Sequence, residues 1–493
     1  MIRPLANFSE SLSHAASLVG SSSPVADVIF SGVSHNHADV EPGDLFVAIA
    51  GATVHGATFI NQARARGAVA VVTDSEGAQI DPSLPVLIVA DVRKAGAQIA
   101  ASLYKYPTRD MTSIAITGTN GKTTVSTLLY QIFHAVGRET GLIGTVETRI
   151  GSERLSSART TPEAPELQAL AATMRERHVR NLVMEASSHA LAMGRIKGSH
   201  FAYVAFTNLS QDHLDFHKDM EAYFQAKAAL FTDEYADMAF INIDSVYGER
   251  LAKETTLLTK TISRDNPKAE WHFTEVIPTR SGAEFSMRGT GGILIESKTR
   301  LHGSYNADNL LLAAALAYEC GVDPIEIAAV IPQLTGASGR LEQIDLGQPY
   351  KAFVDYAHTP DAVAQVLSAA REFTEGKIIA VLGCGGDRDR AKRPLMGAEL
   401  AQGADIAIFT SDNPRSENPD AILQEMISSI DVKSPSATIA DREEAILKAI
   451  SLAEKGDTVL ILGKGHEHGQ EIAGVVHPFE DRLVLAQAIE ARR

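Results

Sequence analysis

A glycine-containing segment at residues 116–125, ITGTNGKTTV, has the residue types that bind phosphate groups. Gly118 and Gly121 let backbone N–H groups turn toward an anion, because neither residue has a Cβ in the way. Lys122 can reach terminal phosphates, and the hydroxyl of Thr123 can bind magnesium. A strand-like run precedes the loop and a helical pattern follows it, so a helix N-terminus would also face the anion. The segment predicts a nucleoside triphosphate site, and the alternative is a glycine turn with a solvated lysine.

A lysine stands among aromatic residues in the segment 219–231, DMEAYFQAKAALF. Met220, Tyr223, Phe224, Lys227 and Phe231 follow helical spacing and would share one stripe. An ammonium group in such surroundings is costly unless it is paired or chemically altered. The alternative is that the stem of Lys227 packs against the stripe while its ammonium group reaches water.

Two possible magnesium ligands follow other strand-like runs. Glu185 comes directly after the apolar run 182–184, and His213 lies in the loop after the run 204–207. Strand ends beside a phosphate loop are positions where a ligand for magnesium can be presented.

From about residue 339 onward, strand-like and helix-like patterns alternate, which predicts a parallel α/β sheet. In such a sheet, ligands bind beyond the carboxyl ends of the strands. The predicted strands of this region cover residues 352–354, 378–382, 406–410 and 458–462.

Composition limits the classes of function that are compatible with the chain. The length of 493 residues predicts two to four domains. A formal net charge of -16 argues against nucleic acid as the main partner. The only two cysteines, Cys320 and Cys384, exclude a disulfide framework, and we interpret Cys384 as a small packed residue. The N-terminal residues are a poor signal peptide and no run is apolar enough to span a membrane, so we expect a soluble, cytoplasmic protein.

Several motifs, in this order, resemble those of the Mur ligase family. They are GTNGKTT, EASSHAL (185–191), NLSQDHLDFH (208–217), the lysine helix, GRLE (339–342), DYAHTPDA (355–362), GCGGDRDRAKRPLMG (383–397), DNPR (412–415) and GKGHE (463–467). The resemblance covers essentially the whole chain. It implies an α/β enzyme with a UDP-muramyl-dipeptide-binding domain at residues 1–107, a central P-loop ATPase domain with a mostly parallel sheet at 108–338, and a Rossmann-like, amino-acid-binding domain at 339–493.

The resemblance also implies an ATP- and Mg²⁺-dependent amide ligation through an acyl phosphate. In the family, the lysine that matches Lys227 is carbamylated, which would turn the cation into an anion that helps to hold magnesium. The implied catalytic residues are Lys122, Glu185, His213 and Lys227, and the implied metal ligands are Thr123, Glu185, His213 and carbamylated Lys227. The implied ATP-binding residues are Gly118, Thr119, Asn120, Gly121, Lys122, Thr123, Thr124, Asn306, Asn309, Arg340, Asp355 and His358.

A UDP-linked muramyl dipeptide is the implied acceptor of the new amide bond. The residues implied to bind it are His37, Thr160, Thr161, Ser187 and Arg195. For the two threonines the alternative is a helix N-cap. The chain has Asn36, His37 and Ala38 where many family members have Asp-Ser-Arg, and Met193 where some have a polar residue, so the uracil contacts stay open. A serine hydrolase built on Ser187 is excluded because the spacing of a nucleophile elbow is missing.

The resemblance implies that the added amino acid is meso-diaminopimelate. Arg415 offers a planar fork that suits its distal carboxylate, whereas Glu467 suits an ammonium group. The other implied contacts are Arg388, Asp412, Asn413, Pro414 and Gly463. The alternative is that Arg415 is a surface turn residue with a salt bridge.

Other functions remain as alternatives. The closest is a related ligase that adds L-lysine or another diamino acid, followed by a folylpolyglutamate synthase, which shares the ATPase core. A third alternative is a P-loop nucleotide-binding protein without ligase activity. We expect a monomer that binds small molecules and no nucleic acid.

Overall fold

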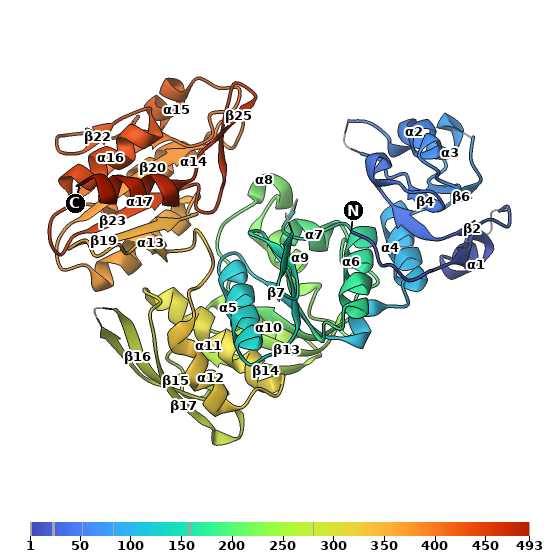
Figure 1. Cartoon of the computed structure of the whole chain (residues 1–493), viewed down its shortest axis with the longest axis horizontal. Coiled ribbons are helices and arrows are strands. Elements are labelled where there is room, and N and C mark those ends of the chain that lie inside the picture. Colours follow the sequence, from blue (N-terminus) through green and yellow to red (C-terminus); the bar gives the residue numbers. More distant parts are fainter. Residues whose placement is uncertain are drawn as a thin grey trace. The chain divides into compact units, whose positions relative to one another are not determined.

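The computed structural model describes residues 2–21, 25–51, 53–81, 83–155, 159–279 and 281–492. It confirms the predicted α/β class, with mostly parallel sheets (Figure 1). The chain divides into two compact units. Unit 1 comprises Met1–Gly118, Leu129–Thr207 and Asp219–Thr261, and unit 2 comprises Thr119–Leu128, Asn208–Lys218 and Ile262–Arg493.

Unit 1 begins with a small sheet of four parallel strands in the order β3-β4-β5-β6. Apolar side chains of these strands pack against α1 and α4 in one core, and against α2 in a second core. The elements of this part are β1 (Glu10–Ser11), α1 (Leu12–Leu18), β2 (Ile29–Phe30), β3 (Gly32–Ser34), η1 (His37–Asp39), β4 (Asp44–Val47), η2 (Gly56–Phe59), α2 (Ile60–Ala65), β5 (Ala70–Thr73), α3 (Gly77–Ile80), β6 (Val86–Ile88), α4 (Val92–Leu103) and η3 (Pro107–Asp110).

The central sheet of unit 1 contains the strand that leads into the phosphate loop. In the order β8-β11-β7-β12-β13 its strands run parallel, and β9 and β10 extend it as an antiparallel edge. The strands are β7 (Thr112–Thr117), β8 (Thr140–Ile143), β9 (Thr148–Ile150), β10 (Glu153–Leu155), β11 (Asn181–Glu185), β12 (Phe201–Phe206), β13 (Ala236–Asn242) and β14 (Leu258–Ser263). The helices that follow or connect them are α5 (Lys122–Ala135), α6 (Ala164–Glu176), α7 (Ser188–Ala192), α9 (Met220–Ala228) and α10 (Val246–Glu254).

Unit 2 contains an antiparallel meander and a second, mostly parallel sheet. The meander is formed by β15 (Trp271–Thr279), β16 (Gly282–Arg288) and β17 (Leu294–Thr299). The other elements before the second sheet are α8 (Leu214–His217), η4 (Thr290–Gly292), α11 (Ser304–Glu319), α12 (Pro324–Val330) and η5 (Ile331–Gln333). The second sheet has the order β18-β19-β23-β20-β21-β22, and only β18 is antiparallel to its neighbour.

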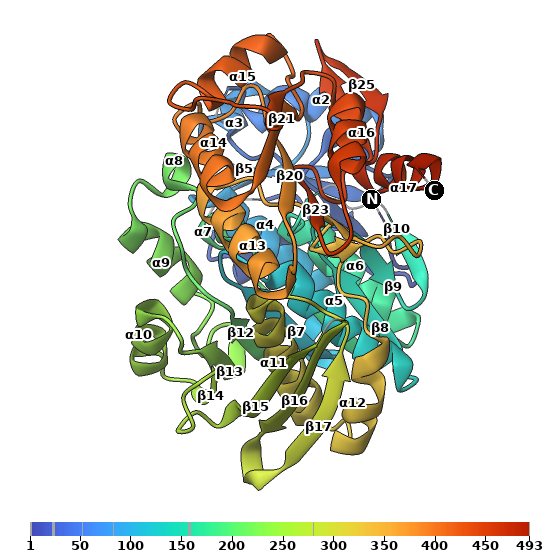
Figure 2. The ribbon, with the colours of Figure 1, turned by 90° about the vertical axis from the view of Figure 1, so that its left-hand side faces the viewer.

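Helices cover both faces of this second sheet (Figure 2). Side chains of α13, α14 and α15 pack on one face, and side chains of α16 and α17 pack on the other. Burial on both faces explains why the predicted strands are continuously apolar. The elements are β18 (Glu342–Gln343), β19 (Lys351–Asp355), α13 (Pro360–Phe373), β20 (Ile378–Cys384), α14 (Lys392–Gly403), β21 (Ile406–Ser411), α15 (Pro419–Met426), β22 (Ala437–Thr438), α16 (Arg442–Leu452), β23 (Thr458–Leu462), β24 (Gly469–Ile472), β25 (Val475–Pro478) and α17 (Asp481–Arg492).

The four strands predicted in this region are confirmed as β19, β20, β21 and β23, with ends within two residues of those expected. The helix predicted after the phosphate loop is α5, and the lysine helix is α9. Cys384 is buried at the end of β20, in agreement with its interpretation as a packed residue. No helix in the described part of the chain has both the length and the apolar character needed to cross a bilayer.

A fully buried ion pair ties two strand ends of the second sheet to α17. The Arg442 and Asp481 side chains are both 0% exposed, and the guanidinium donates two hydrogen bonds of 2.7 Å to the carboxylate. Arg442 also donates to the carbonyl oxygens of Ser411 (3.1 Å) and Leu462 (2.9 Å), which are the last residues of β21 and β23. The charge of Arg442 is therefore compensated while it fixes the two loops that begin at the next residues.

We predict that Asp481→Ala destabilises the protein by about 3–5 kcal/mol, because it leaves an uncompensated buried arginine. Unfolding in denaturant measures this change. Glu221→Ala is the matched control, since it removes a carboxylate that also takes two hydrogen bonds from one arginine, Arg250, but on the surface. We expect a much smaller change in the control. Equal losses in the two variants would contradict the importance of burial.

Candidate functional site

The phosphate loop begins at the carboxyl end of β7, between the parallel neighbours β11 and β12. Gly118 and Gly121 have φ angles of 147° and 86°, a region that residues with a Cβ rarely adopt. Lys122, the first residue of α5, donates from Nζ to the carbonyl oxygen of Thr119 at 2.9 Å. Thr123 and Thr124 in the first turn of the helix are buried. The loop therefore has the strand–loop–helix context that the sequence predicts.

Asn208, just after β12, holds the phosphate loop from the side. Its Oδ1 accepts from the backbone N–H of Asn120 at 2.9 Å, and its Nδ2 donates to the Asn120 carbonyl oxygen at 3.3 Å. The backbone N–H of Thr119 donates to the Asn208 carbonyl oxygen at 2.9 Å. These bonds engage both backbone polar groups of Asn120 and the N–H of Thr119, so they fix the orientation of the loop backbone that is predicted to face a phosphate.

Lys227 lies beside the first residue of the same loop. It is 1% exposed, and its Nζ donates to the carbonyl oxygen of Gly118 at 2.7 Å. The nitrogen also lies 4.6 Å from the ring centroid of Tyr223, one turn earlier on α9. The ammonium group does not extend into water, so the snorkelling alternative is wrong. Burial disfavours the charged form of a lysine, so this position favours a paired or chemically modified amine.

Glu185 ends β11 at the same edge of the central sheet, where it pairs in register with Ile116 of β7. Its carboxylate is buried and accepts from the backbone N–H and the hydroxyl of Thr145, at 2.8 and 3.0 Å. A Cβ on Gly144 would lie 2.4 Å from Glu185 Oε1, so this glycine leaves room for the carboxylate. Glu185 thus presents an oriented carboxylate close to the phosphate-loop strand.

His213 precedes α8 in a left-handed backbone conformation, with φ 53°, and its side chain is 42% exposed. Its Nε2 lies 3.3 Å from Asp212 Oδ2. Among the described side chains, no group of three or more His, Cys, Asp or Glu residues has the geometry of a metal site. The donor set predicted for magnesium consists instead of a hydroxyl, a carboxylate, an imidazole and a modified lysine. Thr123 and Glu185 carry the hard oxygen atoms that magnesium prefers, whereas Lys227 would fit only as a carbamate.

The threonines of the RTTPE segment contact the end of β11. Thr161 Oγ1 donates to the Glu185 carbonyl oxygen at 2.8 Å and accepts from the Ser187 N–H at 3.1 Å. Thr160 Oγ1 lies 3.0 Å from Thr145 Oγ1. Helix α6 starts at Ala164 with Glu163 as N-cap, so the alternative that the threonines cap this helix is wrong. Ser187 itself caps α7, because its Oγ accepts from the N–H of Ala190.

Glu163 joins two arginines beside these threonines. Its carboxylate pairs with Arg195 Nε at 3.0 Å and Arg93 Nη1 at 2.7 Å. Arg195 also donates to the Thr161 carbonyl oxygen at 3.4 Å. Arg93, Glu163 and Arg195 line one small cavity, and the two guanidinium groups there are of the kind that binds the carboxylates of an acidic ligand. Met193 lies in this region, 3.4 Å from Arg195 through its sulfur atom.

The segment in which the chain departs from the resembling family forms the short helix η1. Asn36 caps it by accepting from the Ala38 N–H at 3.1 Å, and it donates to Asp39 at 2.7 Å. The His37 ring stacks on Phe59, with centroids 4.6 Å apart and an angle of 3° between the planes. His37 thus presents an aromatic surface next to a second ring, which suits contact with a planar base.

The ATP-site residues expected in unit 2 lie on α11 and around the end of β19. Asn306 and Asn309 are buried on α11, where Asn306 Nδ2 donates to the His302 carbonyl oxygen. Asp355 ends β19 and accepts from the N–H groups of Leu341 and Ala357, at 2.6 and 2.7 Å.

Charge and aromatic contacts surround this strand end. Burial raises the pKa of the Asp355 carboxyl, although the charge of Arg340 and the two N–H groups act in the opposite direction. The Arg340 guanidinium lies 4.6 Å from the ring centroid of Tyr356. His358 Nδ1 lies 2.8 Å from the Tyr356 carbonyl oxygen. Arg340, Asp355 and His358 are thus gathered around the segment 355–358.

The DNPR and GKGHE loops meet through a buried lysine. Lys464 Nζ donates to Asn413 Oδ1 at 3.1 Å and to Glu467 Oε2 at 2.8 Å, and it lies 3.9 Å from Asp412 Oδ1. Asn413 Nδ2 also donates to Glu467 Oε2 at 2.8 Å. A Cβ on Gly463 would come within 2.7 Å of Asp412 Oδ2. The predicted amino-acid contacts on these two loops are therefore in direct contact with one another.

Burial and charge act differently on the two carboxylates of this cluster. Burial raises the pKa of Asp412, against the opposing charges of Arg442 and Lys464. Burial also opposes ionisation of Glu467, but the charge and hydrogen bond of Lys464 hold the pKa of Glu467 below its ordinary value. Glu467 is thus kept as an anion, which suits its predicted contact with an ammonium group.

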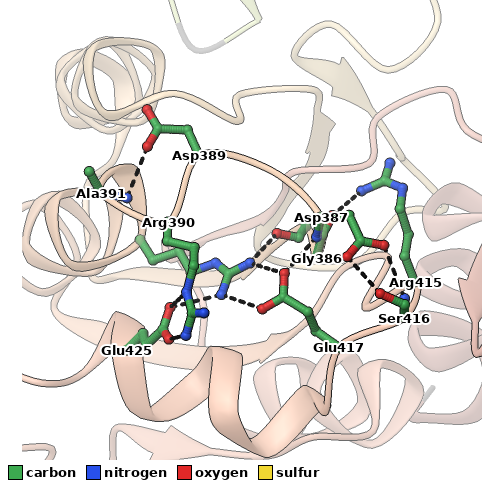
Figure 3. A network of polar contacts seen from close by, with 11 residues as sticks. Gly386, Asp387, Asp389, Arg390, Ala391, Arg415, Ser416, Glu417 and Glu425 are labelled. Atoms are coloured by element: carbon green, nitrogen blue, oxygen red, sulfur yellow. Dashed lines mark hydrogen bonds and ion pairs between the residues drawn. The ribbon is translucent and has the colours of Figure 1, made fainter. Parts of the chain in front are cut away.

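The GCGG and DNPR loops are packed against each other (Figure 3). A Cβ on Gly386 would lie 1.9 Å from the carbonyl oxygen of Pro414. Arg415 Nη1 donates to the Gly386 carbonyl oxygen at 2.7 Å, and its Nε lies 3.4 Å from Glu471. Arg415 therefore has a salt bridge, as in the alternative that it is a surface turn residue. The same side chain also bonds to the neighbouring GCGG loop. Arg388 is exposed on the neighbouring loop. Both arginines lie close to Gly385, since a Cβ added to this glycine would be 3.1 Å from Arg415 Nη1 and 3.7 Å from Arg388 Cγ.

Several residues of these clusters were missed at the sequence level. They are Asn208, which holds the phosphate loop, Glu163, which joins two arginines, and Lys464, which joins the DNPR and GKGHE loops. Asn208 and Lys464 stand inside the motifs that carry the family resemblance, so their position offered a signal. Glu163 lacks such a signal because its partners are distant in sequence.

Family profiles and full-length relatives match the chain. The profile of the Mur ligase middle domain matches residues 116–317, that of the Mur ligase glutamate ligase domain matches 339–465, and that of the Mur ligase family catalytic domain matches 30–104. The chain is 47% identical to the UDP-N-acetylmuramoyl-L-alanyl-D-glutamate--2,6-diaminopimelate ligase of Streptomyces coelicolor, over 99% of this chain and 98% of that protein.

Solved structures show similar folds. A UDP-N-acetylmuramoyl-L-alanyl-D-glutamate--2,6-diaminopimelate ligase structure is 34% identical with a TM-score of 0.68, covering 94% of this chain and 95% of that chain. Folylpolyglutamate synthase of Mycobacterium tuberculosis, complexed with ADP and AMPPCP, is 20% identical with a TM-score of 0.60, and covers 74% of this chain and 91% of that chain. The second similarity is one of fold alone.

We predict that Asn208→Ala weakens ATP binding roughly tenfold, because the phosphate-loop N–H of Asn120 loses its partly buried acceptor. Isothermal titration with a non-hydrolysable ATP analogue measures the affinity. Asn266→Ala is the matched control, since it removes an exposed asparagine that also accepts from a backbone N–H, that of Lys268. Unchanged affinity in Asn208→Ala would show that Asn208 does not orient the loop.

Proposed function

The chain belongs to the Mur ligase family, and we propose that it joins meso-2,6-diaminopimelate to the γ-carboxylate of D-glutamate in UDP-MurNAc-L-Ala-D-Glu. ATP drives the reaction and is converted to ADP and phosphate, and the product is a precursor of peptidoglycan. The observation that carries the proposal is the full-length similarity to diaminopimelate ligases, together with the buried Lys227 beside the phosphate loop. Because ATP and a nucleotide-linked acceptor are its substrates, we propose a cytoplasmic enzyme.

The proposed organisation assigns one substrate to each of three domains. Residues 1–107 and the threonine segment would bind the UDP-dipeptide, residues 108–338 would bind ATP, and residues 339–493 would bind the amino acid. Three separate family profiles, at 30–104, 116–317 and 339–465, support these boundaries. We propose a monomer, since each of these domains comes from one chain.

The proposed chemistry has two steps. The γ-carboxylate of the acceptor attacks the γ-phosphorus of ATP, giving an acyl phosphate and ADP. The diaminopimelate amine then attacks the acyl carbon, loses a proton, and the tetrahedral intermediate expels phosphate to leave the amide. Lys122 and the loop N–H groups would stabilise the transferring phosphoryl group. Bound magnesium would neutralise phosphate charge, held by Thr123, Glu185, His213 and the carbamate of Lys227.

Carbamylation would explain why a lysine occupies the position of Lys227. The neutral amine adds to carbon dioxide, and loss of one proton gives an anionic carbamate. Such a group supplies hard oxygen atoms where an ammonium would repel a cation. The remaining ATP contacts would come from Thr119, Asn120, Thr124, Asn306, Asn309, Arg340, Asp355 and His358, and the acceptor contacts from His37, Thr160, Thr161, Ser187 and Arg195.

The amino-acid site would lie on the loops that meet around Lys464. Glu467 and Asp412 would bind an ammonium group, and Arg388 and Arg415 would bind carboxylate groups, with Asn413, Pro414 and Gly463 shaping the loops. Diaminopimelate has a distal carboxylate that lysine lacks, so the two arginines favour diaminopimelate. A folylpolyglutamate synthase is disfavoured because the similar structure covers only 74% of this chain.

A purified-enzyme assay tests the proposed function. We expect release of ADP and phosphate only when UDP-MurNAc-L-Ala-D-Glu and an amino acid are both present, with meso-diaminopimelate used in preference to L-lysine and L-ornithine. Assays that lack the acceptor or the amino acid serve as controls. Preference for lysine would change the proposed substrate, and ATP consumption that needs no acceptor would favour a P-loop protein without ligase activity.

We predict that Lys227→Ala lowers kcat at least roughly hundredfold, because an electrostatic contact in the phosphoryl-transfer site is lost. A short carboxylic acid added to the assay should restore part of the activity by replacing the carbamate. Lys253→Ala is the control, since it removes a lysine from the exposed face of α10. Full activity of Lys227→Ala would refute the carbamate, and loss of activity without any rescue would argue for a packing role.

A further inference from the structure

A buried arginine at the start of α14 joins three segments near the proposed amino-acid site. Arg393 is 1% exposed, although its neighbours in the segment DRDRAKRP are strongly polar. Its guanidinium donates to both carboxylate oxygens of Glu417, at 2.7 and 2.9 Å, and to Glu425 at 2.8 Å. It also donates to the carbonyl oxygen of Gly385 at 3.1 Å. One side chain thus contacts the loop after β20, the loop after β21 and helix α15.

The two loops that Arg393 joins each carry an arginine of the proposed site. We call residues 385–388, which include Arg388, the first loop, and residues 412–417, which include Arg415, the second loop. The Gly386 N–H donates to the Asn413 carbonyl oxygen at 2.8 Å. Neither loop can move relative to the other without breaking this hydrogen bond and the one from Arg415 to the Gly386 carbonyl oxygen.

Asp387 and Glu417 complete the connection between the loops (Figure 3). The Asp387 N–H donates to Glu417 Oε1 at 2.6 Å, and the Ser416 hydroxyl donates to Asp387 at 2.7 Å. Glu417 therefore binds the first loop through Asp387 and α14 through Arg393, while it belongs to the second loop itself. The orientation of the Glu417 carboxylate depends on Arg393, whose guanidinium donates a hydrogen bond to each of its two oxygens.

Charge balance makes Arg393 the central member of this network. Hydrogen bonds from Arg393 and from the Asp387 N–H lower the pKa of Glu417 to about 2. Without Arg393, the Glu417 and Glu425 carboxylates would stand close together with less compensation, and like charges repel. Arg390 also pairs with Glu425, but from a side chain that is 66% exposed. The guanidinium group that donates hydrogen bonds to Glu417 and to the Gly385 carbonyl oxygen is that of Arg393, not that of Arg390.

We propose that Arg393 is a positioning residue for amino-acid specificity, which holds Arg388 and Arg415 at the spacing that a diamino acid with a distal carboxylate requires. This inference rests on the proposed function of the two loops. Arg393 does not touch the substrate in this role. It acts through the first and second loops, so its removal affects one substrate and leaves the other two sites intact.

The test compares Arg393→Met with Arg390→Met in steady-state kinetics. We expect Arg393→Met to raise KM for meso-diaminopimelate roughly tenfold or more, because small displacements of binding groups have large effects. KM for ATP and for UDP-MurNAc-L-Ala-D-Glu should change less than about twofold. The KM of Arg393→Lys for meso-diaminopimelate should lie between those of the parent and Arg393→Met. Lysine carries the charge but cannot bind Glu417 through two parallel hydrogen bonds. Arg390→Met, the surface control, should retain the KM values of the parent.

Two further measurements separate positioning from a general structural role. The preference for meso-diaminopimelate over L-lysine, as a ratio of kcat/KM values, should fall in Arg393→Met. In an Arg415→Ala background, Arg393→Met should change KM for diaminopimelate by a clearly smaller factor than in the parent, because the two residues act in one unit. Equal rises in the KM of all three substrates, or effects that multiply independently in the double variant, would overturn the proposal.

If Arg393→Met does not fold, Glu417→Gln can be compared with the parent instead. Glutamine has nearly the volume of glutamate, and the position is half-buried. It should also raise KM for diaminopimelate selectively, and an unchanged value would overturn the proposal. Kinetics of the parent enzyme distinguish a failure of the proposed function from a failure of the role of Arg393. A parent that does not use diaminopimelate refutes the proposed function, whereas a parent that does, with variants of unchanged selectivity, refutes only the role of Arg393.

Discussion

Three buried cations of this protein bind carbonyl oxygens at the ends of four parallel strands. Lys227 donates to Gly118 directly after β7, Arg393 donates to Gly385 directly after β20, and Arg442 donates to the last residues of β21 and β23. A carbonyl group that leaves the sheet loses its ladder partner and needs another donor when it is buried. A cation satisfies it and brings a positive charge to the edge where anionic ligands would bind.

These contacts explain how irregular loops can be held as firmly as strands. Each loop begins at a fixed strand end, and a side chain from a separate helix sets its direction. In the second sheet, α14 supplies Arg393 on one face and α16 supplies Arg442 on the other. The residues that would bind substrate are therefore supported by groups that belong to the packed layers, which is the condition for preorganised binding.

The sequence predicts much of this arrangement, for reasons that particular residues make clear. Continuous apolar runs predict β19, β20, β21 and β23, because both faces of that sheet are buried. The glycines and Lys122 predict the phosphate loop together with the strand-like run before them and the helical pattern after them. Arg393 and Arg442 could not be predicted as buried, since each stands in a polar segment and its carboxylate partners are more than twenty residues away in the sequence. Asp481 and Glu417 likewise appear as ordinary helix and loop charges.

The close approach at Gly386 has a consequence for how substrate preference can change during evolution. Since a single methyl group there would collide with the Pro414 carbonyl oxygen, the backbone shapes of the two loops are mutually dependent. A loop transplanted alone from a homologue with another preference would meet an unmatched neighbour. We therefore expect that a change in the backbone of one loop is tolerated only together with a matching change in the other.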